Sequence, residues 1–242
     1  MTQQKRLTLP MIPLRGLVVL PYMILHFDVG RQKSIKALDA ATTGNNLVFL
    51  VTQLSEEIKE PDINQVYGMG TIAKVSQVMR MPGNIVRVLV EGVSRAELIK
   101  MTTGEYATAD VMEYMPTPIT EYDSHTEALI RKLQDYCEKY FAIENKVAPE
   151  ALASVIAAED PGRMSDLIAG NMDLPVRDKQ TILESLDPKE RLKQLIYIIS
   201  RELEYAKLED DIDAKVKAAM DKNQRDYYLR EQLHIIQEEL GD

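Results

Sequence analysis

The sequence of 242 residues has only one cysteine, Cys137. A single thiol cannot form an internal disulfide, so folding does not depend on an oxidising compartment. Long hydrophobic runs are also missing, because Pro10, Pro13 and Pro21 interrupt the apolar stretch at the amino end. That stretch is too short to span a membrane and lacks the small-residue cleavage site of a secretory signal. These absences predict a cytoplasmic protein.

Positive charge is scarce as well, since the formal net charge is −9 at pH 7. Residues 1–115 carry 12 Lys and Arg against 11 Asp and Glu, whereas residues 116–242 carry 17 against 27. Nucleic-acid binding requires clustered cations that displace counterions from phosphates. Neither half has such an excess, so the composition argues against a nucleic-acid partner.

Recognisable catalytic and metal motifs are absent too. None of the eleven glycines is followed by lysine, so the chain has no G-x-x-x-x-G-K-[ST] phosphate loop. His26, His125 and His234 lie in three separate segments without metal-ligand spacing, and no cysteine pair accompanies them. Cys137 falls on the apolar stripe of its helix, which favours a buried structural thiol over a nucleophile. We expect no catalytic residue, no metal and no cofactor in this chain.

Up to about residue 115 the hydrophobic period is near two, and β-branched residues are frequent. This pattern predicts a β-rich domain over residues 1–115 with one helix at 31–42, which Gly44 stops. Met81, Pro82, Gly83 and Asn84 predict a hairpin turn, because Pro presets φ while Gly and Asn tolerate positive φ. The predicted strands cover residues 17–20, 47–51, 71–78, 85–92 and 107–114.

Residues 116–122 read as a linker, because two prolines within the segment PTPIT forbid a helix. The period then becomes 3.6, which predicts a helical bundle over residues 123–204. Its first helix opens with a capping-box pattern, Ser124 to Glu127. Shorter helices are expected near 149–158, 162–170 and 176–186, with Pro149 and Pro161 as first-turn prolines and Asp160 as an N-cap.

Residues 189–240 contain neither Gly nor Pro. As one helix this run would be about 78 Å long at roughly 1.5 Å per residue, so its distal part, residues 205–242, is expected to project from the bundle. The apolar stripe is interrupted at Lys222–Asp226, and the sequence does not decide whether the helix continues through these residues. A lone helix gains little stability from propensity, so this part requires a partner surface.

Three stretches resemble the N-terminal region of ATP-dependent Lon proteases. They are LPMIPLRGLVVLPYMILHFDVGR at the start, YGMGTIAKVSQVMRMPGNIVRVLVEGVSRAEL in the middle and NQRDYYLREQLHIIQEELGD at the end. The resemblance implies an α+β fold, with a small PUA-like β-barrel or sandwich followed by an α-helical bundle that ends in a long projecting helix. It also implies a following AAA+ ATPase and a serine–lysine peptidase, which would hold ATP and Mg and which this sequence does not contain.

The resemblance therefore implies a non-catalytic substrate-recognition and hexamer-assembly region that delivers unfolded, damaged or degron-bearing proteins to the AAA+ pore, without membrane contact. Two alternatives stay open at this point. A PUA-like domain elsewhere binds RNA, although the acidic balance argues against that function here. The second alternative is a purely architectural coiled-coil oligomerisation module, in which the β half has no function of its own.

Flexible, polarisable methionines suit promiscuous binding of apolar segments, and most methionines of this chain fall in the β half. Each of them could equally fill an irregular core. Loop and turn positions are the best candidates for exposure, and strand alternation places Met79 and Met81 on one face. The predicted apolar substrate-binding patch consists of Pro21, Tyr22, Met23, Met79, Met81 and Pro82.

Two further sets of residues are candidates for contacts with neighbouring subunits or substrates. Arg31, Lys33 and Lys36 lie early on the predicted helix and could pair with acidic groups, although an ordinary solvated face is the simpler interpretation. A heptad-like seam near the carboxyl end is suited to helix pairing. Its members are Leu229, Leu233, Ile236 and Leu240.

Overall fold

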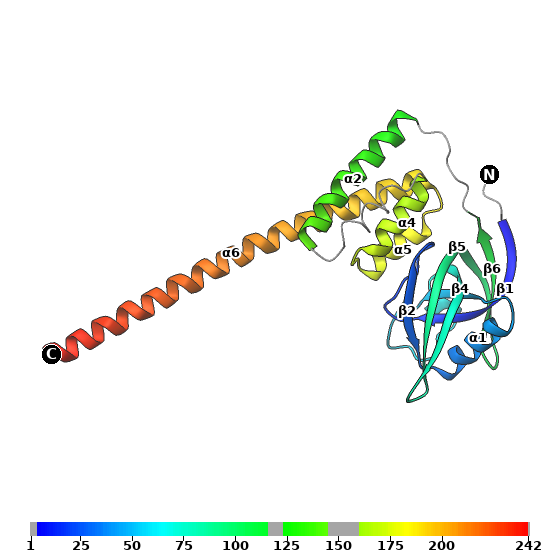
Figure 1. Ribbon diagram of the computed structural model, residues 1–242, viewed down its shortest axis with the longest axis horizontal. Helices are drawn as coiled ribbons and strands as arrows, with labels where there is room; N and C mark the ends of the chain where they lie inside the picture. The colour runs from blue at the N-terminus through cyan, green and yellow to red at the C-terminus, as the bar shows by residue number, and fades with distance from the viewer. Residues whose placement is uncertain (1–3, 116–122, 145–159, 242) are drawn as a thin grey trace. The chain divides into compact units, whose positions relative to one another are not determined.

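The structure, a computed structural model, describes residues 4–115, 123–144 and 160–241 (Figure 1). The chain divides into two compact units, Met1–Ile198 and Ile199–Asp242. The predicted linker at 116–122 and the predicted helix near 149–158 lie outside the described residues. The predicted boundaries near residues 115 and 204 stay predictions.

Six strands form one sheet in the first unit. They are β1 (Gln4–Leu14), β2 (Ile24–Val29), β3 (Leu47–Thr52), β4 (Met69–Met81), β5 (Ile85–Thr103) and β6 (Ala107–Tyr114). The order is β2-β5-β4-β3-β1-β6, and β5 also pairs with β6. This extra pairing closes β5, β4, β3, β1 and β6 into a barrel, while β2 extends the sheet beside β5. The β1–β3 pair is parallel, and the other pairs are antiparallel.

Strand β3 is buried on both faces, which explains its unbroken apolar run. Val48 and Leu50 belong to a hydrophobic cluster that includes helix α1 (Gln32–Thr43). Phe49 and Val51 belong to a second cluster, which joins residues of β1, β4, β5 and β6. The alternation of side chains along a strand therefore places one β3 face in each cluster.

The predicted strand at 17–20 is wrong. These residues form an irregular buried segment, and threonine hydroxyls satisfy carbonyls that a strand partner would otherwise bind. Thr52 Oγ1 donates to Leu17 O at 2.7 Å, and Thr71 Oγ1 donates to Val19 O at 2.5 Å. Strands β1 and β2 were not predicted. In β1, Pro10 and Pro13 obscured the strand pattern.

Strand β5 is longer than the predicted 85–92. Register shifts in its pairing with β4 and with β6 mark irregularities along its 19 residues. Such irregularities bend a strand, so its first half pairs with β2 and its second half with β6. The predicted hairpin turn before β5 is confirmed, with Gly83 at φ 84° and Asn84 at φ 61°.

The helices that follow are α2 (Ser124–Glu144), α4 (Pro161–Asn171), α5 (Val176–Glu184) and α6 (Pro188–Leu240). Asp160 caps α4 as predicted, since its side chain accepts a hydrogen bond from the Arg163 N–H. The predicted cap at Ser124 is wrong, because Asp123 accepts from the Thr126 N–H at 2.8 Å and so precedes the helix as its cap. The predicted α+β class, with helices after the sheet, is confirmed.

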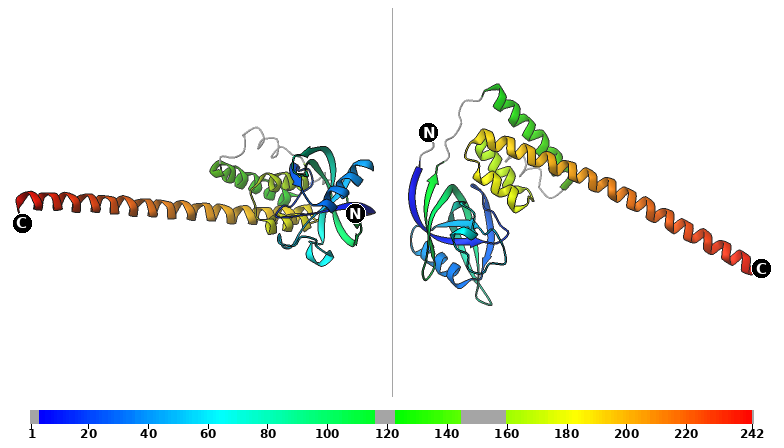
Figure 2. Two further views of the ribbon diagram at one scale, coloured as in Figure 1. Left: turned by 90° about the horizontal axis from the view of Figure 1, so that it is seen from below. Right: turned by 180° about the vertical axis from the view of Figure 1, so that it is seen from behind.

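Helix α6 is uninterrupted over 53 residues, including Lys222–Asp226 (Figure 2). Lys222, Gln224 and Arg225 are good helix formers, and the stretch contains no Gly or Pro, so it continues the helix without an apolar stripe. Within the first unit, Leu192 and Leu195 of α6 are fully buried. Within the second unit, the side chains from Glu204 to Leu240 are almost all exposed.

The loop before β2 requires glycine at position 92 of β5. A Cβ at Gly92 would lie 2.2 Å from Leu20 O, which is shorter than any real contact. We predict that Gly92→Ala lowers the free energy of unfolding by about 1–3 kcal/mol through overpacking. Urea denaturation measures the loss. Gly30→Ala is the control, because a Cβ there meets nothing within 4 Å, and equal losses in both variants would contradict the prediction.

Candidate functional site

The residues predicted as one apolar patch fall into two groups. Residues 21–23 form the loop before β2, whereas Met79, Met81 and Pro82 lie in the β4–β5 hairpin. The Tyr22 N–H donates to Gly92 O at 2.8 Å, and Met81 pairs with Ile85. The seven steps along the strand from Ile85 to Gly92 span about 23 Å at roughly 3.3 Å per residue. The structure therefore does not bring the two groups together.

Pro21 is buried, which contradicts the expectation that it is exposed. The cause is the neighbouring helix α4, against which residues 21–23 lie. A Cβ at Gly170 of α4 would meet Met23 Cγ at 2.7 Å, so the Met23 side chain rests on that glycine. The Met23 sulfur also accepts a hydrogen bond from the Leu20 N–H at 3.2 Å. Both Tyr22 and Met23 are half-buried.

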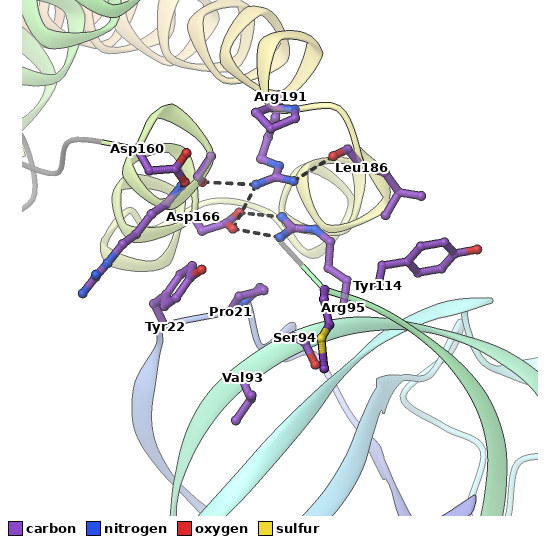
Figure 3. Close-up of a pocket in the computed structure, with 14 residues that line it drawn as sticks. Pro21, Tyr22, Val93, Ser94, Arg95, Tyr114, Asp160, Asp166, Leu186 and Arg191 are labelled. Carbon is purple, nitrogen blue, oxygen red and sulfur yellow. Dashed lines mark hydrogen bonds and ion pairs between the residues drawn. The ribbon is translucent and has the colours of Figure 1, made fainter. Parts of the chain in front are cut away.

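A buried ion cluster adjoins this loop (Figure 3). Arg95 of β5 binds both carboxylate oxygens of Asp166 of α4, at 2.8 and 2.5 Å. Arg191 of α6 binds the same carboxylate at 3.0 Å. The Asp166 side chain is 1% exposed, and each arginine side chain is 6% exposed. Three elements distant in sequence are thus joined through one carboxylate.

Two guanidinium groups face one carboxylate in this cluster, so the excess positive charge requires compensation. The arginines donate to backbone carbonyls at the carboxyl end of α5, Arg95 Nε to Leu183 O at 2.9 Å and Arg191 Nε to Ser185 O at 3.0 Å. These carbonyls lack helical partners and carry the negative end of the helix dipole. Burial lowers the pKa of Arg191 to about 10 despite the opposing effect of Asp166.

A pocket of about 70 Å³ lies over the ion cluster. Tyr22 lines it, and the Arg163 guanidinium lies 5.2 Å from the centre of the Tyr22 ring. Burial, and next the charge of Asp166, raise the pKa of the Tyr22 hydroxyl. The cavity is too small for a drug-sized ligand, so we interpret this region as structural. Sequence reasoning did not single out Arg95, Asp166 or Arg191. The sequence did contain a signal for them, because each is a charged residue at a position where the hydrophobic period of its strand or helix places a buried side chain.

The hairpin group lies on a different surface, which we call the hairpin face: Met79, Met81, Pro82, Ile85 and Leu89. Met79 is 38% exposed, while Met81 and Ile85 are each 40% exposed. Met79 borders a shallow depression of about 410 Å³ with His26 and Arg87. Met79 and Met81 stand opposite Arg87 and Ile85 in a continuous stretch of the β4–β5 register, which places both methionines on one face as predicted.

Ion pairs flank the hairpin face. Arg87 binds Asp28 of β2 with two hydrogen bonds of 2.7 and 2.8 Å. Arg80 lies 3.2 Å from Asp39. The hydrogen bond from Arg87 lowers the pKa of Asp28. The cations of this face are thus neutralised within the chain, and its apolar side chains remain accessible.

The three predicted cationic contacts are all engaged within the chain. Arg31 precedes α1 and donates to Gln53 Oε1 at 2.8 Å, to Lys59 O at 3.0 Å and to Pro13 O. Lys33 lies 2.6 Å from Glu60, and Lys36 lies 3.8 Å from Glu105. The guanidinium of Arg31 therefore ties the loop after β3 to β1. The two lysines form surface ion pairs, which contribute little stability.

The predicted seam of α6 is exposed in the second unit. Leu229 is 52% exposed and Leu240 is 78% exposed. Leu233 and Ile236 lie between these values, at 58% each. These four large apolar side chains are exposed and lie at heptad spacing. Such a pattern is typical of a helix that pairs with another surface.

Among the described residues, the thiol of Cys137 is buried, and the residue types that ligate metals form no cluster. Cys137 is fully buried, and burial raises its pKa to about 12, so the thiol stays protonated near neutral pH. No group of three or more His, Cys, Asp or Glu that could hold a metal occurs in residues 4–115, 123–144 and 160–241. Over the same residues, no helix is both long and apolar enough to cross a membrane.

Comparison with known proteins identifies the class. The family model of the ATP-dependent protease La (LON) substrate-binding domain matches residues 8–201. The structure is similar to the N-terminal domain of Mycobacterium avium complex Lon protease, with a TM-score of 0.62 and 23% identity, covering 80% of this chain and 98% of that one. Fold and family model together define a substrate-binding domain of an ATP-dependent protease.

Sequence relatives support the same assignment. The chain is 44% identical to a Lon protease of Brevibacillus choshinensis, over 97% of this chain and 30% of the relative. It is 40% identical to Lon protease 1 of Bacillus subtilis, over 100% of this chain and 31% of the relative. The chain belongs to the Lon substrate-binding domain family. It spans about a third of the length of these relatives.

The ion cluster gives a stability prediction. We expect Asp166→Asn to lower the free energy of unfolding by about 3–5 kcal/mol, because two buried guanidinium groups lose their counter-ion. Denaturation in urea measures this change. Asp28→Asn is the matched control, since Asp28 also binds an arginine through two hydrogen bonds but is 46% exposed. A loss no greater than that of the control would show that the cluster does not hold the elements together.

Proposed function

We propose that this chain is a non-catalytic substrate-recruitment region that binds exposed hydrophobic segments of unfolded or damaged proteins. The observation that carries the proposal is the hairpin face, where methionine and isoleucine side chains are exposed although a well-packed core lies beneath them. Polarisable, flexible side chains adapt to unrelated apolar sequences. In the intact protease, an ATP- and Mg-dependent AAA+ module would receive the bound chain, and a serine peptidase would cleave it.

The RNA-binding alternative has less support at this surface. Phosphate recognition requires unpaired cations, whereas Arg80 and Arg87 beside the hairpin face are each paired with a carboxylate. The net charge of −9 points the same way. A cytoplasmic location agrees with this proposal and stays a prediction.

The role in assembly rests on α6. Its seam residues at positions 229, 233, 236 and 240 alternate by four, three and four, which is the spacing of a coiled-coil seam. We propose that this seam pairs with other subunits of a homohexamer. Repeating a weak substrate site around such a ring would increase overall affinity through avidity.

Substrate binding is tested with a labelled, permanently unfolded casein titrated with the 242-residue chain. We expect Met81→Asp to weaken binding about tenfold, because a charge is costly to bury against an apolar segment. Thr181→Asp adds the same charge on an exposed part of α5 and is the control. Unchanged affinity in Met81→Asp would exclude the hairpin face. Failure of the unmodified chain to bind casein would contradict the proposed function itself.

The seam is tested with two neighbouring isoleucines. Ile236 lies on the seam and is 58% exposed, whereas Ile235 lies off it and is 52% exposed. We predict that the chain self-associates in sedimentation equilibrium and that Ile236→Asp weakens this association at least about tenfold, while Ile235→Asp has little effect. Equal effects of the two substitutions, or a chain that stays monomeric, would contradict pairing through the seam.

A further inference from the structure

A second concave surface lies in the β-rich part of the first unit, away from the hairpin face. It is a pocket of about 680 Å³ between β1, the amino end of α1, the loop after β3 and the β5–β6 hairpin. This volume falls within the range of pockets that hold small ligands. We call it the basic pocket. The residues that define it are Met11, Arg15, Arg31, Lys33, Lys59 and Met101.

The floor of the basic pocket is apolar. Met101 is half-buried and offers apolar surface to the pocket, whereas Met11 and Pro61 are buried behind the lining and Met11 has no exposed surface. The two methionines belong to the second hydrophobic cluster or pack against it. An apolar floor of this kind accepts side chains of varied shape.

The rim carries four cations and only two carboxylates. Both carboxylates are already bound: Glu60 pairs with Lys33 at 2.6 Å, and Asp62 accepts from the Asn64 N–H at 2.8 Å. Arg15 and Arg31 donate only to uncharged oxygens. Across the described parts of the chain, neither guanidinium has a carboxylate partner.

The two guanidinium groups line the same pocket. Burial, and next the charge of Arg15, lower the pKa of Arg31. Like charges held together without a counter-ion destabilise the free protein, and a bound anion relieves that repulsion. Arg31 is fixed by its hydrogen bonds to the protein, whereas Arg15 is exposed and retains free N–H donors.

The amino end of α1 adds to the positive potential. Gln32, Lys33 and Ser34 line the pocket. The helix has no side-chain cap and no acidic residue in its first turn. Its first N–H groups therefore lack the usual side-chain acceptor, and the helix dipole favours an anion beside them.

We propose that the basic pocket binds the C-terminal end of an unfolded polypeptide, with the α-carboxylate at Arg15 and the terminal apolar side chain on Met101. A free C-terminus is the part of a protein in which a carboxylate is attached directly to the Cα of an apolar residue. It therefore matches an anion site that adjoins an apolar floor. A phosphate would satisfy the charge but leave the floor empty. This inference rests on the proposed function and names the class of substrate.

The test uses a fluorescent peptide with an apolar C-terminal segment, prepared as the free acid and as the C-terminal amide. We expect the acid to bind the 242-residue chain about tenfold more tightly than the amide, because charge-assisted hydrogen bonds are lost in the amide. Arg15→Gln should abolish this preference, and Arg15→Lys should retain part of it. Lys59→Gln, at a second exposed rim cation, should reduce it.

Lys74→Gln is the matched control, because Lys74 is an exposed cation on β4 that does not line the pocket. Equal binding of acid and amide, or equal loss of the preference in Lys74→Gln and Arg15→Gln, would overturn the carboxylate site. If casein still binds through the hairpin face in that case, the proposed function stands while this inference fails. Binding of inorganic phosphate in competition with the acid at micromolar concentration would also overturn it, by showing a general anion site.

Discussion

The first unit depends on one carboxylate that two arginines share. Asp166 is almost fully buried and brings together β5, α4 and the start of α6. The same guanidinium groups bind the free carbonyls at the end of α5, so the fourth element is fixed by the same cluster. Buried ions are costly, and this arrangement offsets the cost only because every charged group has several partners.

Around this cluster, smaller contacts determine which residues remain free to bind other molecules. Met23 packs on Gly170, and Gln180 of α5 donates to Met69 O at 3.0 Å. The first contact covers an apolar side chain of the loop before β2, and the second ties α5 to the start of β4. At the other end of β4, α1 reaches Arg80 through Asp39, whereas Met79 and Met81 of the hairpin are 38% and 40% exposed.

The sequence predicted features that depend on neighbouring residues. The turn at Gly83 and Asn84 and the cap at Asp160 follow from local backbone preferences, and both are present. The helical period of residues 189–240 was visible as well, although continuity through Lys222–Asp226 was left open and is established by the structure. It did not predict features that depend on distant partners. The segment 17–20 has strand composition, yet its carbonyls bind threonine hydroxyls of β3 and β4.

The same distinction applies to the candidate sites. A methionine at 23 and a methionine at 81 are indistinguishable by composition, and only the position of α4 decides which is covered. Arg31 looked like a surface cation, but it is tied to the loop after β3 while its charge remains unpaired by any carboxylate in the described residues. The heptad spacing of α6 was visible in the sequence because all the seam residues lie on one helix.

The hairpin face and the basic pocket differ in the selectivity that they can provide. Dispersion and apolar burial at exposed methionines are non-directional, so the hairpin face can accept many sequences but holds each weakly. An unpaired guanidinium beside an apolar floor is directional, because it distinguishes a charged end from an uncharged one. A chain that engages both surfaces gains effective concentration for the second contact. On the proposed function, general affinity for unfolded protein and preference for particular ends therefore come from separate parts of one barrel, and each can change without the other.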